Sequence, residues 1–136
     1  MMYLLDVSTL LAFGLREHVF HERVATWVRM LESQEEANLA TCAITELGFL
    51  RILTQASSYN FTTAQGKALL SQLKMTKGLR FSFLADNQGL EDLPLWVNGP
   101  KQITDGHLLG LAMAHGARMA TLDERIPGAL VIPGKI

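Results

Sequence analysis

The 136-residue sequence lacks the features that would place it in a membrane or outside the cell. No apolar run approaches the ~20 residues of a membrane-spanning helix, and the N-terminus has no basic segment of the kind that opens a signal peptide. Its single cysteine, Cys42, cannot form a disulfide within the chain, which fits a reducing compartment. We therefore expect a cytoplasmic protein without a membrane segment.

Several motifs of cofactor and nucleophile chemistry are also missing. The sequence has no G-x-x-x-x-G-K-[ST] or G-x-G-x-x-G segment to cradle a nucleotide phosphate, and no G-x-S-x-G elbow to present a serine nucleophile. His18 and His21 have no partners at zinc-site spacing. The net charge of −1 argues against a protein that is basic over its whole surface and binds nucleic acid in that way.

The sequence does contain a regular alternation of strand-like and helical segments, with 49% hydrophobic residues to form a core. The predicted strands cover 2–6, 37–41, 81–84, 118–122 and 130–132. The predicted helices cover 8–13, 18–33, 44–55, 62–77 and 104–115. This alternation predicts one α/β domain over residues 1–136, with a central, mainly parallel sheet of about five strands.

Four acidic residues lie at the edges of apolar segments, where a carboxylate is costly: Asp6, Glu46, Asp105 and Asp123. Asp6 ends one predicted strand and Asp123 follows another, and the other two lie in the first turns of predicted helices. In a parallel sheet these positions can converge on one edge. Carboxylates are the ligands that Mg²⁺ and Mn²⁺ prefer, and such ions can activate water against a phosphodiester. Without these four charges the chain would carry +3, which is compatible with a nucleic-acid ligand.

Each acid also has an ordinary structural explanation. Asp6 and Asp105 could cap helices, Asp123 could lie in a solvated turn, and Glu46 could pair with Arg51 or another base. Helix capping does not explain Glu46, which shares a helical face with apolar residues.

Several other polar and aromatic residues each allow a functional and a structural interpretation. Ser8 and Thr121 could orient a carboxylate or a metal-bound water, or serve as a helix cap and a packed strand residue. Arg51 could contact a substrate phosphate or form an ion pair. Lys74 could end a solvated helix or contact phosphate, and Trp96, in a predicted loop, could pack or stack on a base.

Four segments together resemble the PIN-domain family, and in particular the VapC-type toxins of bacterial toxin–antitoxin pairs. The segments are 3–11, 45–51, 103–109 and 120–123, in the expected order along the whole chain. The resemblance implies a magnesium-dependent endoribonuclease with a three-layer α/β/α fold and a sheet of order 3-2-1-4-5. It also implies a homodimer and an antitoxin whose tail blocks the acidic site.

The resemblance further assigns roles to single residues. Asp6, Glu46 and Asp105 would be the core ligands of Mg²⁺ or Mn²⁺, and Asp123 the fourth acid. Arg51 matches an arginine common in the subgroup. There are two departures: Ser8 stands where many relatives have Asn, and Gly106 stands where Ala is more usual.

Two other functions fit the same acids. A non-catalytic module could keep the fold and use it to hold a peptide or RNA. A receiver-type domain could accept a phosphoryl group on one aspartate, but it would need a lysine near the fifth strand. Lys101, the nearest candidate, lies in the wrong element.

Overall fold

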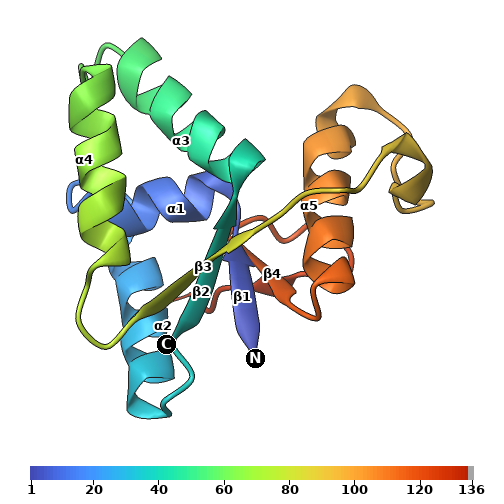
Figure 1. Ribbon diagram of the computed structural model, residues 1–136, viewed down its shortest axis with the longest axis horizontal. Helices are drawn as coiled ribbons and strands as arrows, with labels where there is room; N and C mark the ends of the chain where they lie inside the picture. Colours follow the sequence, from blue (N-terminus) through green and yellow to red (C-terminus); the bar gives the residue numbers. More distant parts are fainter. Residues whose placement is uncertain (135–136) are drawn as a thin grey trace.

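A five-stranded sheet forms the centre of the protein in a computed structural model that describes residues 1–134 (Figure 1). The strands are β1 (Met2–Leu5), β2 (Asn38–Cys42), β3 (Arg80–Leu84), β4 (Arg118–Thr121) and β5 (Leu130–Val131). They are ordered β3-β2-β1-β4-β5, and all neighbouring strands are parallel. The predicted order is confirmed, and it puts β1 at the centre.

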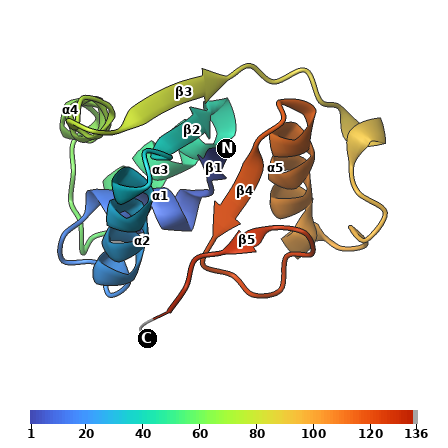
Figure 2. The same ribbon diagram turned by 90° about the horizontal axis from the view of Figure 1, so that it is seen from below.

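Helices cover both faces of this sheet. Those in residues 1–134 are α1 (Val7–Gly14), α2 (His21–Ser33), α3 (Ala43–Gln55), α4 (Thr63–Lys74) and α5 (Ile103–Ala114). The first four lie on one side of the sheet and α5 lies on the other (Figures 1 and 2). Two single 3₁₀ turns, Leu90–Asp92 and Pro100–Gln102, interrupt the long connection from β3 to α5. The predicted three-layer α/β/α architecture is therefore confirmed.

The two faces of β1 pack into two separate hydrophobic cores, because successive side chains of a strand point to opposite faces. Leu5 belongs to the core beneath α1, α2 and α3, together with Leu10 and Phe49. Leu4 belongs to the core beneath α5, together with Leu108. Burial on both faces explains why the strand is a continuous apolar run.

Local hydrogen bonds fix where the helices begin. Thr62 caps α4, as predicted, because its hydroxyl accepts the Gln65 N–H at 3.1 Å while the Gln65 side chain accepts the Thr62 N–H at 2.9 Å. Two predicted helix boundaries were wrong. The helix expected from His18 begins three residues later, because the His18 ring accepts the Phe20 N–H in a preceding turn. The helix expected to reach Lys77 ends at Lys74.

Close packing brings α3 against the first turn of α1. A Cβ atom on Gly48 would lie 2.7 Å from Val7 Cγ2, so only glycine allows the two helices to approach this closely. The contact fixes α3 near the carboxyl end of β1. None of the helices in residues 1–134 combines the length and apolar character needed to traverse a lipid bilayer.

Candidate active site

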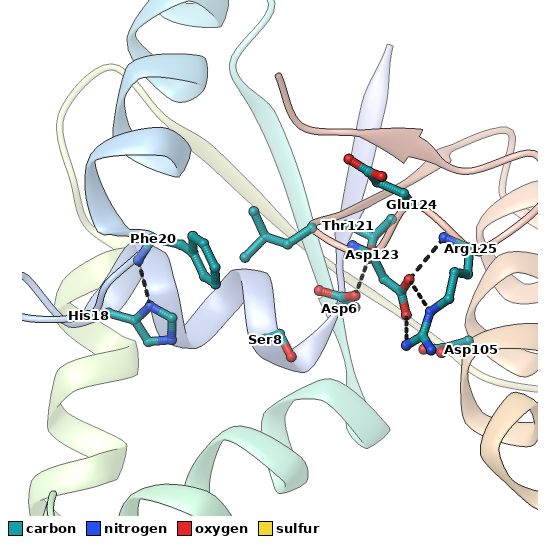
Figure 3. A pocket seen from close by; sticks show the side chains of 10 residues that line it. Asp6, Ser8, His18, Phe20, Asp105, Thr121, Asp123, Glu124 and Arg125 are labelled. Atoms are coloured by element: carbon teal, nitrogen blue, oxygen red, sulfur yellow. Dashed lines mark hydrogen bonds and ion pairs between the residues drawn. The ribbon is translucent and has the colours of Figure 1, made fainter. Parts of the chain in front are cut away.

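A pocket of about 610 Å³ opens at the carboxyl edge of the sheet, beyond the adjacent strands β1 and β4 (Figure 3). The chain continues from β1 to β2 on one side, and β4 lies on the other, so this is the switch point where ligands of parallel sheets bind. Five of the seven predicted site residues line the pocket: Asp6, Ser8, Asp105, Thr121 and Asp123.

Asp6 is fixed by two hydrogen bonds, one to each carboxylate oxygen. The Thr9 N–H donates to Oδ1 at 2.9 Å, so Asp6 is the N-cap of α1. The Thr121 hydroxyl donates to Oδ2 at 2.6 Å. Asp6 is therefore a helix cap, as one explanation offered by the sequence expected, and part of the pocket wall at the same time.

Thr121 connects two of the acids. Its buried hydroxyl donates to Asp6 and accepts the backbone N–H of Asp123 at 3.0 Å. This side chain orients a carboxylate, as the sequence suggested, and is not simply packed in the strand. Ser8 lines the pocket from the first turn of α1 with an exposed side chain.

Asp105 lies in the first turn of α5 and does not cap that helix, because the N-cap position belongs to Gln102. Burial raises the pKa of the Asp105 carboxyl, and the negative charges of Asp6 and Asp123 raise it further. Arg125 opposes the shift. The negative charge of the pocket thus exceeds the positive charge of Arg125, the guanidinium beside it. Such a site favours a cation.

Asp123 forms an ion pair with Arg125, two residues further along the chain (Figure 3). Arg125 Nε donates to Oδ1 at 3.0 Å and Nη2 donates to Oδ2 at 3.1 Å. These hydrogen bonds, with a third from the Arg125 backbone N–H, lower the pKa of Asp123. The Arg125 side chain is 88% exposed, so the pair is weak and exchangeable. The sequence analysis missed Arg125, although its spacing of two from Asp123 was a usable signal.

Glu46 does not line this pocket. Its Oε2 accepts the Thr41 hydroxyl at 2.6 Å and lies 2.5 Å from Lys74 Nζ. Its basic partner is therefore Lys74 of α4 and not Arg51, which is exposed and lies outside the pocket. The predicted convergence of the acids is found for three of the four, because Thr41 and Lys74 hold the fourth on the α3–α4 side.

The residues fit a hard divalent cation in chemistry and in charge. Four carboxylates line one pocket, those of the three predicted aspartates and of Glu124, and the like charges of Asp6 and Asp123 act on Asp105. Within residues 1–134, no three acidic, histidine or cysteine side chains stand close enough to share one ion. Lys74 and Arg125 instead neutralise Glu46 and Asp123. Ion binding would therefore require the carboxylates to move closer together, and Lys74 and Arg125 to give up their present partners.

His18 and Phe20 form the wall opposite Arg125 (Figure 3). His18 Nδ1 accepts the Phe20 N–H at 3.0 Å, so the neutral ring carries its proton on Nε2. Burial, and then the charge of His21, lowers the pKa of His18, which favours this neutral form. The sequence analysis considered His18 only as a zinc ligand and missed its place in the pocket.

Comparison with known proteins places the chain in a family. No family model matches the sequence. Ribonuclease VapC44 of Mycobacterium tuberculosis is 36% identical, with 96% of this chain and 92% of that protein aligned. Ribonuclease VapC38 of the same organism is 37% identical over 92% of this chain and 87% of that protein. Ribonuclease VapC39 is 32% identical over 90% and 89%.

A solved structure agrees in fold. Mycobacterium tuberculosis VapC20, described as a sarcin–ricin loop cleaving toxin, matches with a TM-score of 0.58 and 10% sequence identity. The match covers 91% of this chain and 92% of that chain. The sheet order and the acidic pocket at its carboxyl edge define a protein of the PIN-domain class. Within that class, the chain belongs to the VapC family.

Proposed function

We propose that this protein is a metal-dependent endoribonuclease and the toxin of a type II toxin–antitoxin pair. The observation that carries the proposal is the pocket at the carboxyl edge of the sheet, which is lined by the three predicted aspartates together with Glu124. It occurs in a chain whose curated relatives, at 30–37% identity, are named ribonucleases.

Asp6, Asp105 and Asp123 are the proposed ligands of Mg²⁺ or Mn²⁺. In this proposal Glu46 is the fourth acid and contributes when the ion replaces Lys74 as its cationic partner. When bound, such an ion supplies a Lewis acid that lowers the pKa of a water molecule and offsets charge on a phosphodiester.

The other residues of the pocket orient these acids and contact the RNA. The Thr9 N–H and the Thr121 hydroxyl hold the two oxygens of Asp6 in place. Arg125 exchanges the carboxylate of Asp123 for a substrate phosphate, which its planar guanidinium can bind through two N–H groups. His18 offers its Nε2–H to an RNA oxygen from the opposite wall.

Two other predicted contacts are peripheral. The Ser8 hydroxyl is the proposed partner of a metal-bound water, because it lines the pocket and is exposed. Arg51 stays a predicted phosphate contact from outside the pocket, on the exposed face of α3.

The substitution Asp6→Asn tests the proposal. Asparagine can still accept the Thr9 N–H and cap α1, so the fold should persist. We expect wild-type protein to cleave structured RNA with Mg²⁺ and to lose cleavage with EDTA. We expect the variant to lose at least about 100-fold in rate. Asp92→Asn is the control, since Asp92 accepts the Gly89 N–H and does not line the pocket. Undiminished cleavage by Asp6→Asn would falsify the proposal.

We also propose a cognate antitoxin and a homodimer, as the family resemblance implies. Exposed apolar side chains on α3, at the end of α4 and on β3 support a surface that a protein partner covers: Leu47, Ile52, Met75 and Phe83. Sedimentation at micromolar concentration tests the dimer, and a purely monomeric protein would contradict it. Calorimetry with Mg²⁺ tests the non-catalytic alternative, which predicts no ion-dependent heat.

A further inference from the structure

A second pocket of about 440 Å³ adjoins the acidic pocket and shares Asp105, Asp123 and Arg125 with it. We propose that this pocket binds one nucleobase of the RNA substrate, next to the phosphate at the acidic site. We further propose that it prefers bases rich in carbonyl acceptors, guanine or uracil, over adenine. The inference rests on the proposed ribonuclease function and names the part of the substrate that the chain would recognise.

The pocket, called the base pocket from here on, is built by the connection between β3 and α5. Its own lining residues include Trp96, Asn98, Lys101 and Gln102. In the sequence this connection is rich in turn-forming residues, and in the structure it lies beside α5 (Figure 1). The base pocket therefore comes from a segment that the acidic site does not use.

Gly106 allows this connection to close on the first turn of α5. A Cβ atom at Gly106 would lie 2.3 Å from Val97 Cγ2, 3.4 Å from Pro94 Cδ and 3.7 Å from Trp96 Cη2. No real Cβ contact is as short as the first of these, so an alanine would push the connection outward. Gly106, which stands where Ala is more usual, thus lets Trp96 pack beside the residue that follows Asp105.

Trp96 offers an aromatic surface at a fixed position. It is half-buried, packs against the core beneath α5 and still lines the pocket. Stacking of a base on such a ring is the usual way in which proteins hold single-stranded RNA. The sequence left open whether Trp96 packs or stacks, and the structure is compatible with both at once.

The hydrogen-bond donors of the base pocket come mainly from the connection itself, whereas its two carboxylates, Asp105 and Asp123, belong to the acidic site. Gln102 Oε1 accepts the Asn98 N–H at 2.8 Å. The Nε2 group of the same side chain donates no hydrogen bond within residues 1–134, so it can donate to a ligand. Lys101 and Arg125 add two cations. Donors of this kind pair with the carbonyl oxygens of guanine and uracil, whereas adenine presents an amino group. A pocket of ~300–1,000 Å³ is the usual size for a small ligand, so one nucleoside fits.

NMR of the two tryptophan indole N–H groups tests the inference on the full chain. Trp27 is buried in the other core, so the two signals report separate places. With EDTA present, we expect GMP and UMP to shift the Trp96 signal in a saturable way and to leave Trp27 unchanged. AMP should bind more weakly, and ribose 5-phosphate should give no comparable shift. An equal response to ribose 5-phosphate, or tighter binding of AMP, would overturn the proposal.

Two glycine substitutions on α5 provide a matched pair of variants. Gly106→Ala should displace the connection and weaken GMP or UMP binding about tenfold, the loss expected when one stacked base is disturbed. Gly110→Ala should bind as wild type, because its Cβ would meet only the Asp92 carbonyl oxygen at 3.5 Å. Both add the same methyl group to the same helix. Equal affinity in the two variants would contradict the proposal.

The cleavage pattern on a randomised RNA separates this inference from the function on which it rests. We expect wild-type protein to prefer guanine or uracil at one position beside the cleaved bond, and Gln102→Leu to lose that preference while it still cleaves. An unchanged preference in Gln102→Leu refutes the base pocket alone. Absence of cleavage by wild-type protein refutes the proposed function, and the nucleotide titration then still decides whether the pocket binds a base.

Discussion

The Lys74 ammonium of α4 lies 2.5 Å from the Glu46 carboxylate of α3, and both side chains are mostly buried. Lys74 Nζ also lies 5.9 Å from the centre of the Phe83 ring. The pair joins two helices. It includes Glu46, the acid that the family resemblance assigns to a metal ion. A bound ion and Lys74 would therefore compete for the same carboxylate.

This competition predicts a metal-dependent coupling between the two residues. In a double-mutant cycle with Glu46→Gln and Lys74→Met, we expect a coupling of about 0.5–1 kcal/mol in the free energy of unfolding when EDTA is present. The coupling should fall towards zero in saturating Mg²⁺, because Glu46 then faces the ion. Urea unfolding of the four proteins measures it. A coupling that is the same in EDTA and in Mg²⁺ would remove Glu46 from the set of metal ligands.

Thr121 predicts an effect on activity through the orientation of Asp6. Thr121→Val keeps the shape of the side chain but removes the hydroxyl that donates to Asp6 and accepts from Asp123. We expect RNA cleavage to fall 10–100-fold, the usual effect of losing a group that orients a ligand, and stability to fall by about 1–2 kcal/mol. Initial rates and urea unfolding measure these effects.

Thr9→Val is the matched control for this substitution. Thr9 is equally buried, but its hydroxyl makes only a long 3.5 Å contact with the Ala120 carbonyl, and its backbone N–H still caps with Asp6. We expect activity close to wild type. If both valine variants lose the same activity, the Thr121 hydroxyl has no specific role in orienting Asp6.

Arg125 predicts a change in metal affinity. Arg125→Gln removes the cation that pairs with Asp123 and offsets the charge felt by Asp105. Without RNA, we expect the variant to bind Mg²⁺ up to about fivefold more tightly, as exchange of an exposed ion pair of ~0–1 kcal/mol allows. Calorimetric titration measures the affinity. Arg29→Gln, which breaks the exposed pair with Glu22, should bind as wild type. Weaker Mg²⁺ binding by Arg125→Gln would contradict the exchange.

The lowered pKa of Asp86 predicts a small change in the stability of the fold at acid pH. Burial acts to raise its pKa, but the hydrogen bonds from the Gln88 N–H and His107, with the nearby histidine charges, outweigh burial and lower it. A lowered pKa stabilises the fold above the unfolded-state value of about 3.9, and this contribution is lost as the pH falls through the folded-state pKa.

We therefore expect Asp86→Asn to cost about 0.3–0.5 kcal/mol at neutral pH, and its difference from wild type to disappear below about pH 4. Urea unfolding at a series of pH values measures both quantities. Glu91→Gln is the control, since this exposed acid has no side-chain hydrogen bond or ion pair within residues 1–134. A difference that grows as the pH falls would refute the assignment.

Much of the fold could be predicted because its signals are local. Hydrophobic periodicity and turn residues located the strands and helices, and Thr62 marked the start of α4. The order of the strands came from the family resemblance, because periodicity does not record which strands are neighbours. The predicted helix boundaries at His18 and Lys77 were wrong, since a side-chain hydrogen bond precedes the real start of the first helix and Met75 is already the C-cap of the second.

The candidate site was predictable only as a set of residue types at the ends of strands. Asp6, Asp105 and Asp123 line one pocket because β1 and β4 are adjacent and α5 begins beside them. The Glu46–Lys74 contact spans 28 positions and depends on the reach of a flexible side chain, which no sequence spacing encodes. The packing of the Trp96 segment on Gly106 was likewise invisible, because the sequence showed only a glycine where Ala is more usual.

The hydrogen bond from the Thr9 N–H to Asp6 gives this acid a role in the fold that is separate from any role in catalysis. A descendant of this chain that stopped cutting RNA would still need an acceptor at position 6 to start its first helix, so aspartate or another capping residue such as asparagine would persist there without catalysis. Asp105 and Asp123 cap no helix and would be free to drift. In surveys of inactive relatives, the loss of those two acids should therefore mark the loss of enzymatic activity earlier than the loss of a capping residue at position 6.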